Sequence, residues 1–465
     1  AFGTYYGFKN ILESENQIKT FQQKVPVYDY EKMHARWWLQ QQTEENITWP
    51  GKPDYFALSA STTGEESKRI PVTEAMLDSI RSVGIEQFTS LTNFDLPPEF
   101  FERDLLMLSS TSDLKKHKDH LEGEISGITV QNFPDWFKGF YKPGLDIAAI
   151  SDWDERVEEI ARQAPNWDIA GMSGIPSWIQ LMLRRIIEYH KVNNIHDVWP
   201  NLQVYASGGV AFEPYRKSFD ELMAKPIHVL DTYLASEGFF AYTARPGTLS
   251  MRLAINHDIF YEFIPFDERG FDDLGNLLED PLALTIDQVE KDQTYAMIVS
   301  TPAGAWRYMI GDTVKFTDKE RLEIELTGRT KFWLNVAGSQ LAEDKMNTAI
   351  KELSEYLNVK IEEFSVSAMS VGAGKYMHQW VLGSDKPFPE SKAAAQLDTI
   401  IKRINKAYAM ARTKALQSME VKQISKETFY SWLEKDKKKG GQTKTPKVLP
   451  EERMSAFLDF IKETS

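Results

Sequence analysis

Three apolar segments of this chain each run directly into small residues, and this repeated pattern is the feature that most limits the fold. The segments cover residues 167–174, 201–209 and 227–238, and a helical pattern continues from the first of them through His190. Strands that alternate with helices and end in small-residue loops are typical of a parallel or mixed α/β sheet. In such sheets, ligands gather at the carboxyl ends of the strands. The sequence therefore predicts an α/β fold with a binding site along one sheet edge.

A fourth apolar segment, residues 55–58, leads into a loop rich in hydroxyl groups. The loop holds the run Ser61-Thr62-Thr63, and Lys68 follows five residues later. We expect it to lie between a strand and a helix that Thr73 caps, with apolar helix positions at helical spacing. Backbone N–H groups and hydroxyls in such a loop can surround a phosphate chain, and a lysine adds a charge-assisted hydrogen bond worth roughly 1.5–3 kcal/mol. Alone, a loop of this composition indicates only a polar surface loop.

Length and charge narrow the class of protein. A chain of 465 residues is too long for one simple core, so two domains are expected. The net charge of −14 argues against nucleic acid or an anionic membrane as a partner. No cysteine is present, which excludes disulfides and thiolate metal sites. Without an apolar run of about 20 residues or a signal peptide, a cytoplasmic location is expected.

The predicted secondary structure changes twice in the second half of the chain. Residues 239–327 are rich in expected strands, and the pattern then changes at residues 328–331. Beyond this point we expect a small α+β domain with a long helix from Ser391 to about Met410. The predicted division is an N-terminal domain of residues 1–328 and a small C-terminal domain of residues 329–465.

Two further segments carry residue types that suit ATP. One is Tyr233-Leu-Ala-Ser-Glu237, and the other is Trp306-Arg-Tyr-Met-Ile-Gly-Asp312. An aromatic ring at a strand end can stack on adenine, and a carboxylate can hold Mg²⁺, which prefers oxygen ligands and phosphate partners. An aspartate can accept hydrogen bonds from ribose hydroxyls, and an arginine such as Arg329 can neutralise phosphate. Each segment alone is weak support for a nucleotide site.

In chain order, the three motifs together resemble the acyl-adenylate-forming superfamily, and in particular the auxin-responsive acyl acid–amido synthetases and their bacterial relatives. That family carries a hydroxyl-rich loop with Ser-Lys and Ile-Pro, a Tyr-x-x-Ser-Glu segment and a Tyr-Arg-x-x-x-Gly-Asp segment. Supporting stretches are residues 174–178, 207–214, 378–380 and 441–446. The resemblance extends over nearly the whole chain.

The resemblance implies a fold and a reaction. The fold would be a large N-terminal domain of α/β sheets and a distorted β-barrel, with a small mobile C-terminal domain. The reaction would use ATP and Mg²⁺ to convert a carboxylic acid to an acyl-adenylate, and an amine, usually of an amino acid, would then displace AMP. Positioning and charge neutralisation would carry most of the catalysis.

The resemblance also implies roles for individual residues. Phosphate contacts would come from Ser61, Thr62, Thr63 and Lys68. The α-phosphate and Mg²⁺ would be served by Ser236 and Glu237, and Glu237 would be the metal ligand.

The nucleoside and the moving domain would use the remaining residues. Adenine would lie along Ser207, Gly208 and Gly209, with Tyr233 stacked on it. Asp312 would bind ribose, with Arg329 near ribose or phosphate. Lys331 would lie close to the domain hinge, and Lys444 would be the catalytic lysine that reaches the acyl-phosphate.

Several positions depart from the family pattern and leave alternatives open. Ala60-Ser61 stands where the family has Ser-Gly, Trp306 replaces a Tyr, and Met309 occupies a position where Arg is common. One alternative is an acyl-CoA-type ligase with a thiol acceptor. The other is a nucleotide-binding protein with degenerate catalysis.

The eight histidines suggest no metal site. His117 and His120 are expected on one face of a helix, surrounded by lysines and without a third ligand. We therefore interpret both as solvated helix residues.

Overall fold

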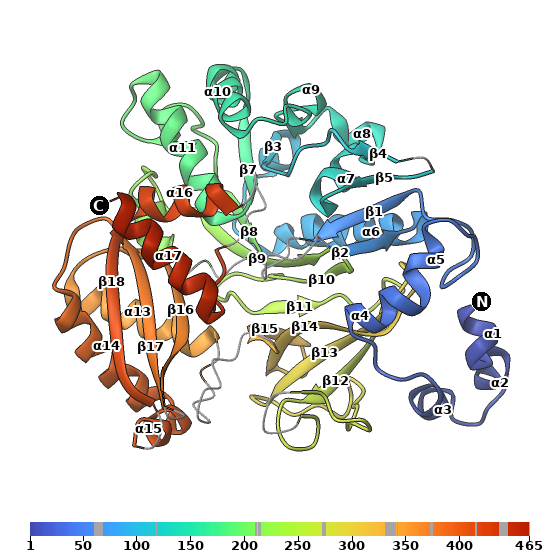
Figure 1. Ribbon diagram of the computed structural model, residues 1–465. Helices are drawn as coiled ribbons and strands as arrows, with labels where there is room; N and C mark the ends of the chain where they lie inside the picture. The colour runs from blue at the N-terminus through green and yellow to red at the C-terminus, as the bar shows by residue number, and fades with distance from the viewer. Residues whose placement is uncertain are drawn as a thin grey trace.

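The computed structural model describes most of the chain and confirms the predicted α/β class. The described residues are 1–59, 68–117, 119–209, 212, 215–271, 276–330, 341, 343–372, 375–413, 416–436 and 445–464. They form three β-sheets of eleven, four and three strands. Figure 1 shows the largest sheet in the middle of the molecule, with the three-stranded sheet and its helices as a lobe to one side.

Short helices occupy the first 41 residues. Residues 30–41 form a continuous helical stretch, with one π-helical turn inside it that buries Trp37 and Trp38. The elements are α1 (Phe2–Tyr6), α2 (Phe8–Leu12), α3 (Gln17–Lys24), α4 (Tyr30–Met33), the π-helix His34–Trp38 and α5 (Leu39–Gln41).

The four-stranded sheet corrects the interpretation of the hydroxyl-rich loop. Its order is β2-β1-β5-β4, where β1 and β2 are antiparallel. Residues 60–67 therefore connect two strands, whereas the sequence predicted a connection from strand to helix. The segment Lys68–Val72 contains Pro71, so its sequence does not predict a strand. It nevertheless forms β2 at an edge of the sheet, where proline is tolerated. The strands are β1 (Tyr55–Ser59), β2 (Lys68–Val72), β4 (Lys115–Lys116) and β5 (Leu121–Gly123).

The eleven-stranded sheet consists of a parallel and an antiparallel half. Its order is β12-β13-β14-β15-β11-β10-β9-β8-β7-β3-β6, and the pairs from β9 to β6 are parallel. The strands are β3 (Asp104–Met107), β6 (Tyr141–Lys142), β7 (Ile169–Gly174), β8 (Val204–Gly208), β9 (His228–Ala235), β10 (Gly238–Tyr242), β11 (Met251–Leu253), β12 (Phe260–Pro265), β13 (Thr294–Thr301), β14 (Ala305–Asp318) and β15 (Glu323–Arg329).

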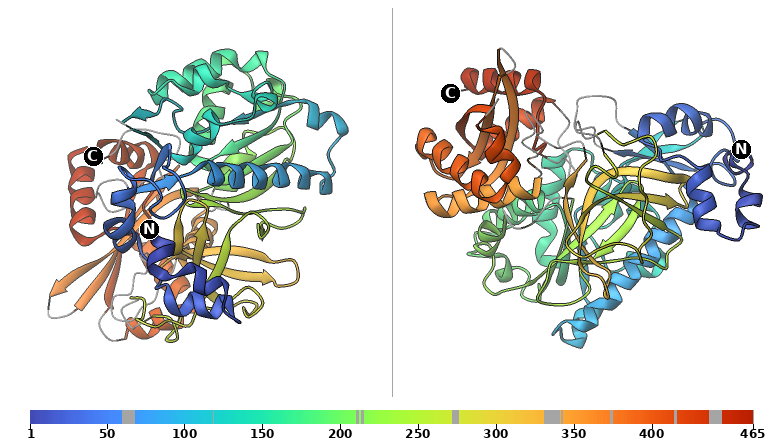
Figure 2. Two further views of the ribbon diagram at one scale, coloured as in Figure 1. Left: turned by 90° about the vertical axis from the view of Figure 1, so that its right-hand side faces the viewer. Right: turned by 90° about the horizontal axis from the view of Figure 1, so that it is seen from below.

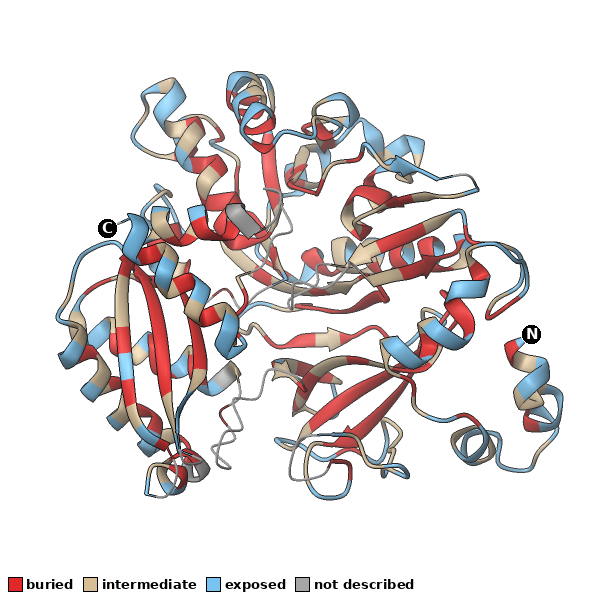
Figure 3. Cartoon of the chain, in the orientation of Figure 1, coloured by how far each residue is buried: buried red, intermediate tan, exposed pale blue. Residues whose placement is uncertain are grey.

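Most of the antiparallel half lies in residues 239–327, which the sequence predicts to be rich in strands. Among the described residues, these strands hydrogen-bond in an open order. Their side chains supply much of the main apolar core, and Figure 3 shows the resulting buried stretches along the central strands.

Helices cover the large sheet, and α6 begins where its sequence predicts. Thr73 Oγ1 accepts a hydrogen bond from the backbone N–H of Met76 and donates one to the carbonyl of Pro302. The helices are α6 (Glu74–Ser90), α7 (Ile125–Gln131), α8 (Asp135–Lys138), α9 (Leu145–Ala148), α10 (Trp153–Gln163), α11 (Pro176–His190) and α12 (Arg216–Asp220). Single 3₁₀ turns lie at Leu91–Asn93, Pro98–Glu102, Ala164–Asn166 and Ile195–Asp197.

The last part of the chain is a three-stranded sheet with helices on both faces. Trp380 packs in the core that α13 and α14 share, whereas the next residue, Val381, packs in the core of α16 and α17. This alternation is what a strand buried on both faces requires. The elements are α13 (Glu343–Leu357), β16 (Ile361–Gly372), β17 (Lys375–Ser384), α14 (Glu390–Ile404), α15 (Lys406–Ala411), β18 (Leu416–Ser425), α16 (Lys426–Asp436) and α17 (Glu451–Thr464).

The long helix expected from Ser391 to Met410 is two helices. Asn405 interrupts it, because its backbone is extended and its side chain accepts a hydrogen bond from the backbone N–H of Tyr408, which starts α15. Asparagine competes for backbone hydrogen bonds in this way and favours caps over helix interiors.

Among the described residues, hydrogen bonds, ion pairs and ring contacts join the lobe of the three-stranded sheet to the rest of the molecule. The Tyr215 hydroxyl donates a hydrogen bond of 2.6 Å to Glu363 on β16, and Lys360 pairs with Glu221. Figure 2 shows this lobe beside the large sheet from two further directions. Within the described residues, every helix is too short or too polar to span a membrane.

Candidate active site

The predicted site residues begin at the carboxyl ends of three parallel strands. Gly174 at the end of β7 pairs with Ser207 on β8, and Gly208 pairs with Thr232 on β9. The chain then turns back through Ser236 and Glu237 into β10. The sequence pattern of strands followed by small residues predicted a binding site at the carboxyl edge of the sheet. These small residues meet at that edge.

Backbone geometry explains the two glycines at the carboxyl end of β8, Gly208 in the strand and Gly209 just after it. A Cβ atom on Gly208 would lie 2.8 Å from Thr232 Oγ1, which itself donates a hydrogen bond of 2.9 Å to the carbonyl of Ser207. Gly209 has a φ of 83°, in the left-handed region where glycine is favoured. The chain is thus held close to β9 without side chains at these two positions.

Tyr233, Asp312 and Arg329 form one hydrogen-bonded group. The Tyr233 hydroxyl donates to Asp312 Oδ2 over 2.6 Å, and Arg329 Nε lies 2.8 Å from Asp312 Oδ1. Asp312 on β14 and Arg329 on β15 are also cross-strand partners in the sheet. Both carboxylate oxygens are therefore engaged, and the negative charge of Asp312 raises the pKa of Arg329.

The ring of Tyr233 is more enclosed than its predicted stacking role requires. Its side chain packs edge-to-face on Phe240, with ring centroids 5.2 Å apart, and the residue is 5% exposed. Burial raises the pKa of Tyr233 well above its ordinary value, so the phenol stays protonated and remains a hydrogen-bond donor. Stacking on adenine stays a prediction.

Glu237 is a buried carboxylate among charged neighbours. Burial, reinforced by the charge of Asp312, raises its pKa, while Lys68 and Arg329 act in the opposite direction. Tyr308 also lies near Glu237. Burial and the negative charge of Glu237 both raise the pKa of this tyrosine. A desolvated carboxylate beside two cations matches the donor chemistry of a Mg²⁺–phosphate site.

Lys68 is the one residue of the predicted phosphate loop that the structure describes. It opens β2 opposite Ser59, and its Nζ atom lies 5.0 Å from the centroid of the Tyr30 ring. The Tyr30 hydroxyl in turn accepts a hydrogen bond from the backbone N–H of Arg69. Ser61, Thr62, Thr63, Lys331 and Lys444 lie outside the described residues.

The structure therefore brings together Lys68, Tyr233, Glu237, Asp312 and Arg329, which come from four separate parts of the chain. It also adds Tyr30 and Tyr308, which sequence reasoning missed. Tyr308 stands inside the Trp306–Asp312 motif and could have been identified there. Tyr30 precedes the nearest motif by about thirty residues and carries no sequence signal.

Comparison with known protein families gives three consecutive matches. The GH3 family N-terminal domain matches residues 1–158, the central domain matches residues 252–329 and the C-terminal domain matches residues 342–453. Together these matches cover well over half of the chain.

The relatives found by sequence are distant and match only in part. A jasmonoyl–L-amino acid synthetase, GH3.5 of Oryza sativa subsp. japonica, is 26% identical over 273 residues, which is 54% of this chain and 46% of the rice protein. An indole-3-acetic acid-amido synthetase, GH3.2 of Arabidopsis thaliana, is 23% identical and covers 41% of this chain and 37% of its own length. The matched segments thus span about half the length of these relatives or less.

Solved structures match over almost the full length. The AtGH3.15 acyl acid amido synthetase in complex with 2,4-DB has a TM-score of 0.76 at 16% identity, covering 98% of this chain and 90% of that one. A 2-hydroxyisobutyryl-CoA ligase in complex with 2-HIB-AMP has a TM-score of 0.54 at 12% identity, covering 97% and 85%. The fold is therefore that of the adenylate-forming enzymes, and with its three consecutive domain matches the chain belongs to the GH3 family.

Proposed function

We propose that this protein is an acyl-adenylate-forming ligase that joins a carboxylic acid to an amine, usually that of an amino acid, to form an amide. The observation that carries the proposal is the Tyr233–Asp312–Arg329 group with buried Glu237 beside it, at the carboxyl edge of the parallel strands. Membership of the GH3 family supports the same reaction, since the relatives are named as synthetases of jasmonoyl- and indole-3-acetyl-amino acid conjugates.

ATP binding would rest on the group around Asp312. Its carboxylate would accept hydrogen bonds from the ribose hydroxyls, while Arg329 and Tyr233 hold its orientation. Adenine would lie along the backbone of Ser207, Gly208 and Gly209, of which the two glycines carry no side chain.

The phosphates would lie toward Lys68 and Glu237. Lys68 would offset the phosphate charge with the hydroxyls of Ser61, Thr62 and Thr63, and Ser236 would contact the α-phosphate. Glu237 would hold Mg²⁺, which when bound neutralises charge on the phosphates. Lys331 near the hinge and Lys444 at the acyl-phosphate complete the proposed set.

In the first step, a carboxylate oxygen of the acid attacks the α-phosphorus of ATP, and the bond to pyrophosphate breaks. In the second, the neutral amine nitrogen attacks the acyl carbon, the bond to AMP breaks and the amine loses a proton. The protein supplies alignment of the reacting groups and preorganised charge, which together can supply several kcal/mol of barrier reduction.

The test is pyrophosphate release from ATP and Mg²⁺ across aromatic and aliphatic carboxylic acids without an amine, followed by an amino-acid screen with mass detection of the amide. Release with one class of acid, and an amide with one or more amino acids, is the expected result. A product that forms only with coenzyme A would instead establish the thiol-acceptor ligase. ATP binding without turnover on any acid would support the degenerate nucleotide-binding protein.

A further inference from the structure

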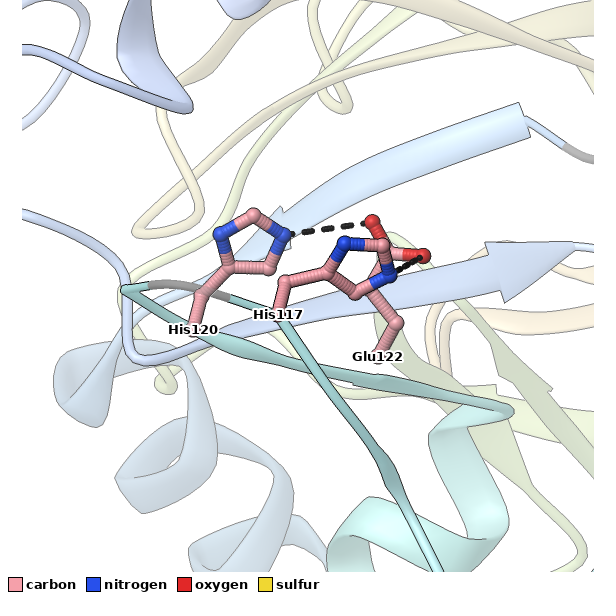
Figure 4. Close-up of side chains that lie close together, drawn as sticks. All are labelled: His117, His120 and Glu122. Carbon is pink, nitrogen blue, oxygen red and sulfur yellow. Dashed lines mark hydrogen bonds and ion pairs between the residues drawn. The ribbon is translucent and has the colours of Figure 1, made fainter.

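A second cluster of chemistry-bearing side chains lies away from the nucleotide residues. His117 and His120 belong to the β4–β5 hairpin, and the sequence interpretation of both as helix residues is wrong. The expectation that no third ligand follows is also wrong, because the Glu122 carboxylate on β5 contacts both rings and completes a three-residue group. Figure 4 shows all three side chains converging on one point.

Each imidazole points one nitrogen at a different oxygen of the same carboxylate. His117 Nε2 lies 3.1 Å from Glu122 Oε2, and His120 Nε2 lies 3.2 Å from Glu122 Oε1. The rings stack with centroids 5.1 Å apart and an interplanar angle of 8°. The side chains of His120 and Glu122 are 9% and 4% exposed, whereas that of His117 is 45% exposed. The cluster thus has a buried floor and one side open to solvent.

This donor set and its spacing suit a first-row transition metal. Imidazole nitrogen and carboxylate oxygen bind Zn²⁺ at about 2.0–2.2 Å, so tetrahedral ligand atoms lie about 3.3 Å apart. The two nitrogen–oxygen separations are close to that value, and one ligand atom from each residue lies within 4.8 Å of the others. The exposed His117 ring can move the remaining distance, and a water would complete the coordination.

Neighbouring side chains fix the two buried ligands. Arg69 Nε donates a hydrogen bond of 3.0 Å to Glu122 Oε1, and Phe56 packs edge-on against the His120 ring at 4.7 Å. A carboxylate offers about four lone-pair sites, so Arg69 and a metal can share Glu122. Partners of this kind orient metal ligands. His120 Nδ1 is buried without a hydrogen-bond partner among the described residues. This holds both when Nε2 carries a proton and when Nε2 binds a metal.

The geometry points to a Zn²⁺ site made of His117 Nε2, His120 Nε2 and the Glu122 carboxylate. All three ligands lie in the β4–β5 hairpin, so a bound ion closes this hairpin, whose strand β5 pairs with β1 in the four-stranded sheet. Glu122 pairs with Phe56 on β1, and Arg69 pairs with Leu58 across β1 and β2. A bound ion therefore stabilises both strands that flank the hydroxyl-rich segment, independently of the proposed reaction.

The test is a calorimetric titration of Zn²⁺ into tag-free, chelator-treated full-length protein, with Co²⁺ absorption spectra as a second measurement. One ion per chain is expected, with the visible bands of a tetrahedral Co²⁺ site. His117→Ala is the primary variant because that side chain is exposed, and removal of this ligand should weaken Zn²⁺ binding at least about tenfold. The double variant with His120→Ala should bind no ion at this site.

The matched control is His257→Ala. His257 also pairs with a glutamate, Glu86, but in the described part of the chain no second imidazole joins that pair. Loss of His257 should leave the stoichiometry and affinity for Zn²⁺ unchanged. The proposal is overturned if the wild-type chain binds no Zn²⁺, or if the His117→Ala variant binds it with wild-type affinity.

Discussion

Strand β14 contributes one residue to each of two arginine–carboxylate pairs. One pair is buried, whereas the other is partly exposed. Arg307 and Glu262 have side chains only 5% and 1% exposed, with Arg307 Nε 3.0 and 3.1 Å from the two carboxylate oxygens. Arg307 also donates to the carbonyls of Gln22 and Val25, and the Gln22 side chain donates to Glu262. This closed network joins the N-terminal helices to the sheet.

The second pair, Arg329 with Asp312, is open. The two side chains are 36% and 17% exposed, and Asp312 also accepts a hydrogen bond from the Tyr233 hydroxyl. Glu237, whose raised pKa reflects burial, lies in the same electrostatic environment. The contrast shows that charge pairing alone does not mark a ligand site. A buried and hydrogen-bonded pair is costly to break, whereas a pair that keeps an exposed side can bind a ligand.

The largest effect is expected from Arg307→Ala. Removal of the guanidinium leaves Glu262 buried without its charge partner, a change that costs about 3–5 kcal/mol in other proteins. The measurement is the free energy of unfolding in denaturant. Arg269→Ala is the control, because its pair with Asp267 is largely exposed and should cost less than about 1 kcal/mol. Equal losses in the two variants would remove the distinction between closed and open pairs.

Next in size is Asp312→Ala. It should lower kcat/KM for ATP in pyrophosphate release at least about 100-fold, roughly 2.7 kcal/mol of transition-state stabilisation, while unfolding changes little. Direct ATP binding, followed by calorimetry, should weaken as well. If ATP affinity survives in both this variant and Lys68→Ala, these residues do not form the nucleotide site.

Tyr233→Phe should have a smaller effect on the same site. It removes the hydroxyl that orients Asp312 and leaves the ring in place, so KM for ATP should rise about five- to tenfold. Tyr261→Phe is a close control, since that ring also packs edge-on against Phe240 while its hydroxyl donates to Ala254. A rise in KM of similar size in the control would indicate a packing effect rather than a role for the Tyr233 hydroxyl.

The smallest effect concerns stability and pH. Because burial raises the pKa of Glu237 above its ordinary value of 4.5, the protonated carboxyl group favours folding, and this contribution is fully present at pH values below 4.5. This contribution is lost as the pH rises through the folded-state pKa. Glu237→Gln should therefore stabilise the protein at pH 7, on the order of 1 kcal/mol, and abolish most activity. The stability difference from wild type should vanish at low pH; a difference that grows as the pH falls would contradict this.

Local patterns in the sequence predicted much of the fold. Thr73 and the apolar spacing after it predicted α6, and the strands that end at Gly174, Gly208 and Ala235 predicted the binding edge. These features depend on near neighbours along the chain. The antiparallel pairing of β2 with β1 was missed, because Pro71 masks the strand pattern and sheet pairing is not encoded locally.

Long-range contacts explain the rest of the site. The link from Tyr30 to Arg69 joins residues 39 positions apart, and that from Tyr233 to Asp312 joins residues 79 apart. Trp306, a departure from the family pattern, donates to the carbonyl of Thr48 and stacks near Phe2, so its role is to hold the N-terminal segment. One sequence without its fold does not show such partners.

The most direct test of the proposed chemistry follows an oxygen atom. With an acid that supports turnover, labelled with ¹⁸O in its carboxylate, the reaction is run with ATP and an amino acid, and the AMP is weighed by mass spectrometry. Attack of the acid on the α-phosphorus predicts one ¹⁸O in the AMP and an amide as the second product. Unlabelled AMP, or release of ADP and phosphate, would contradict an acyl-adenylate and with it the account of this site.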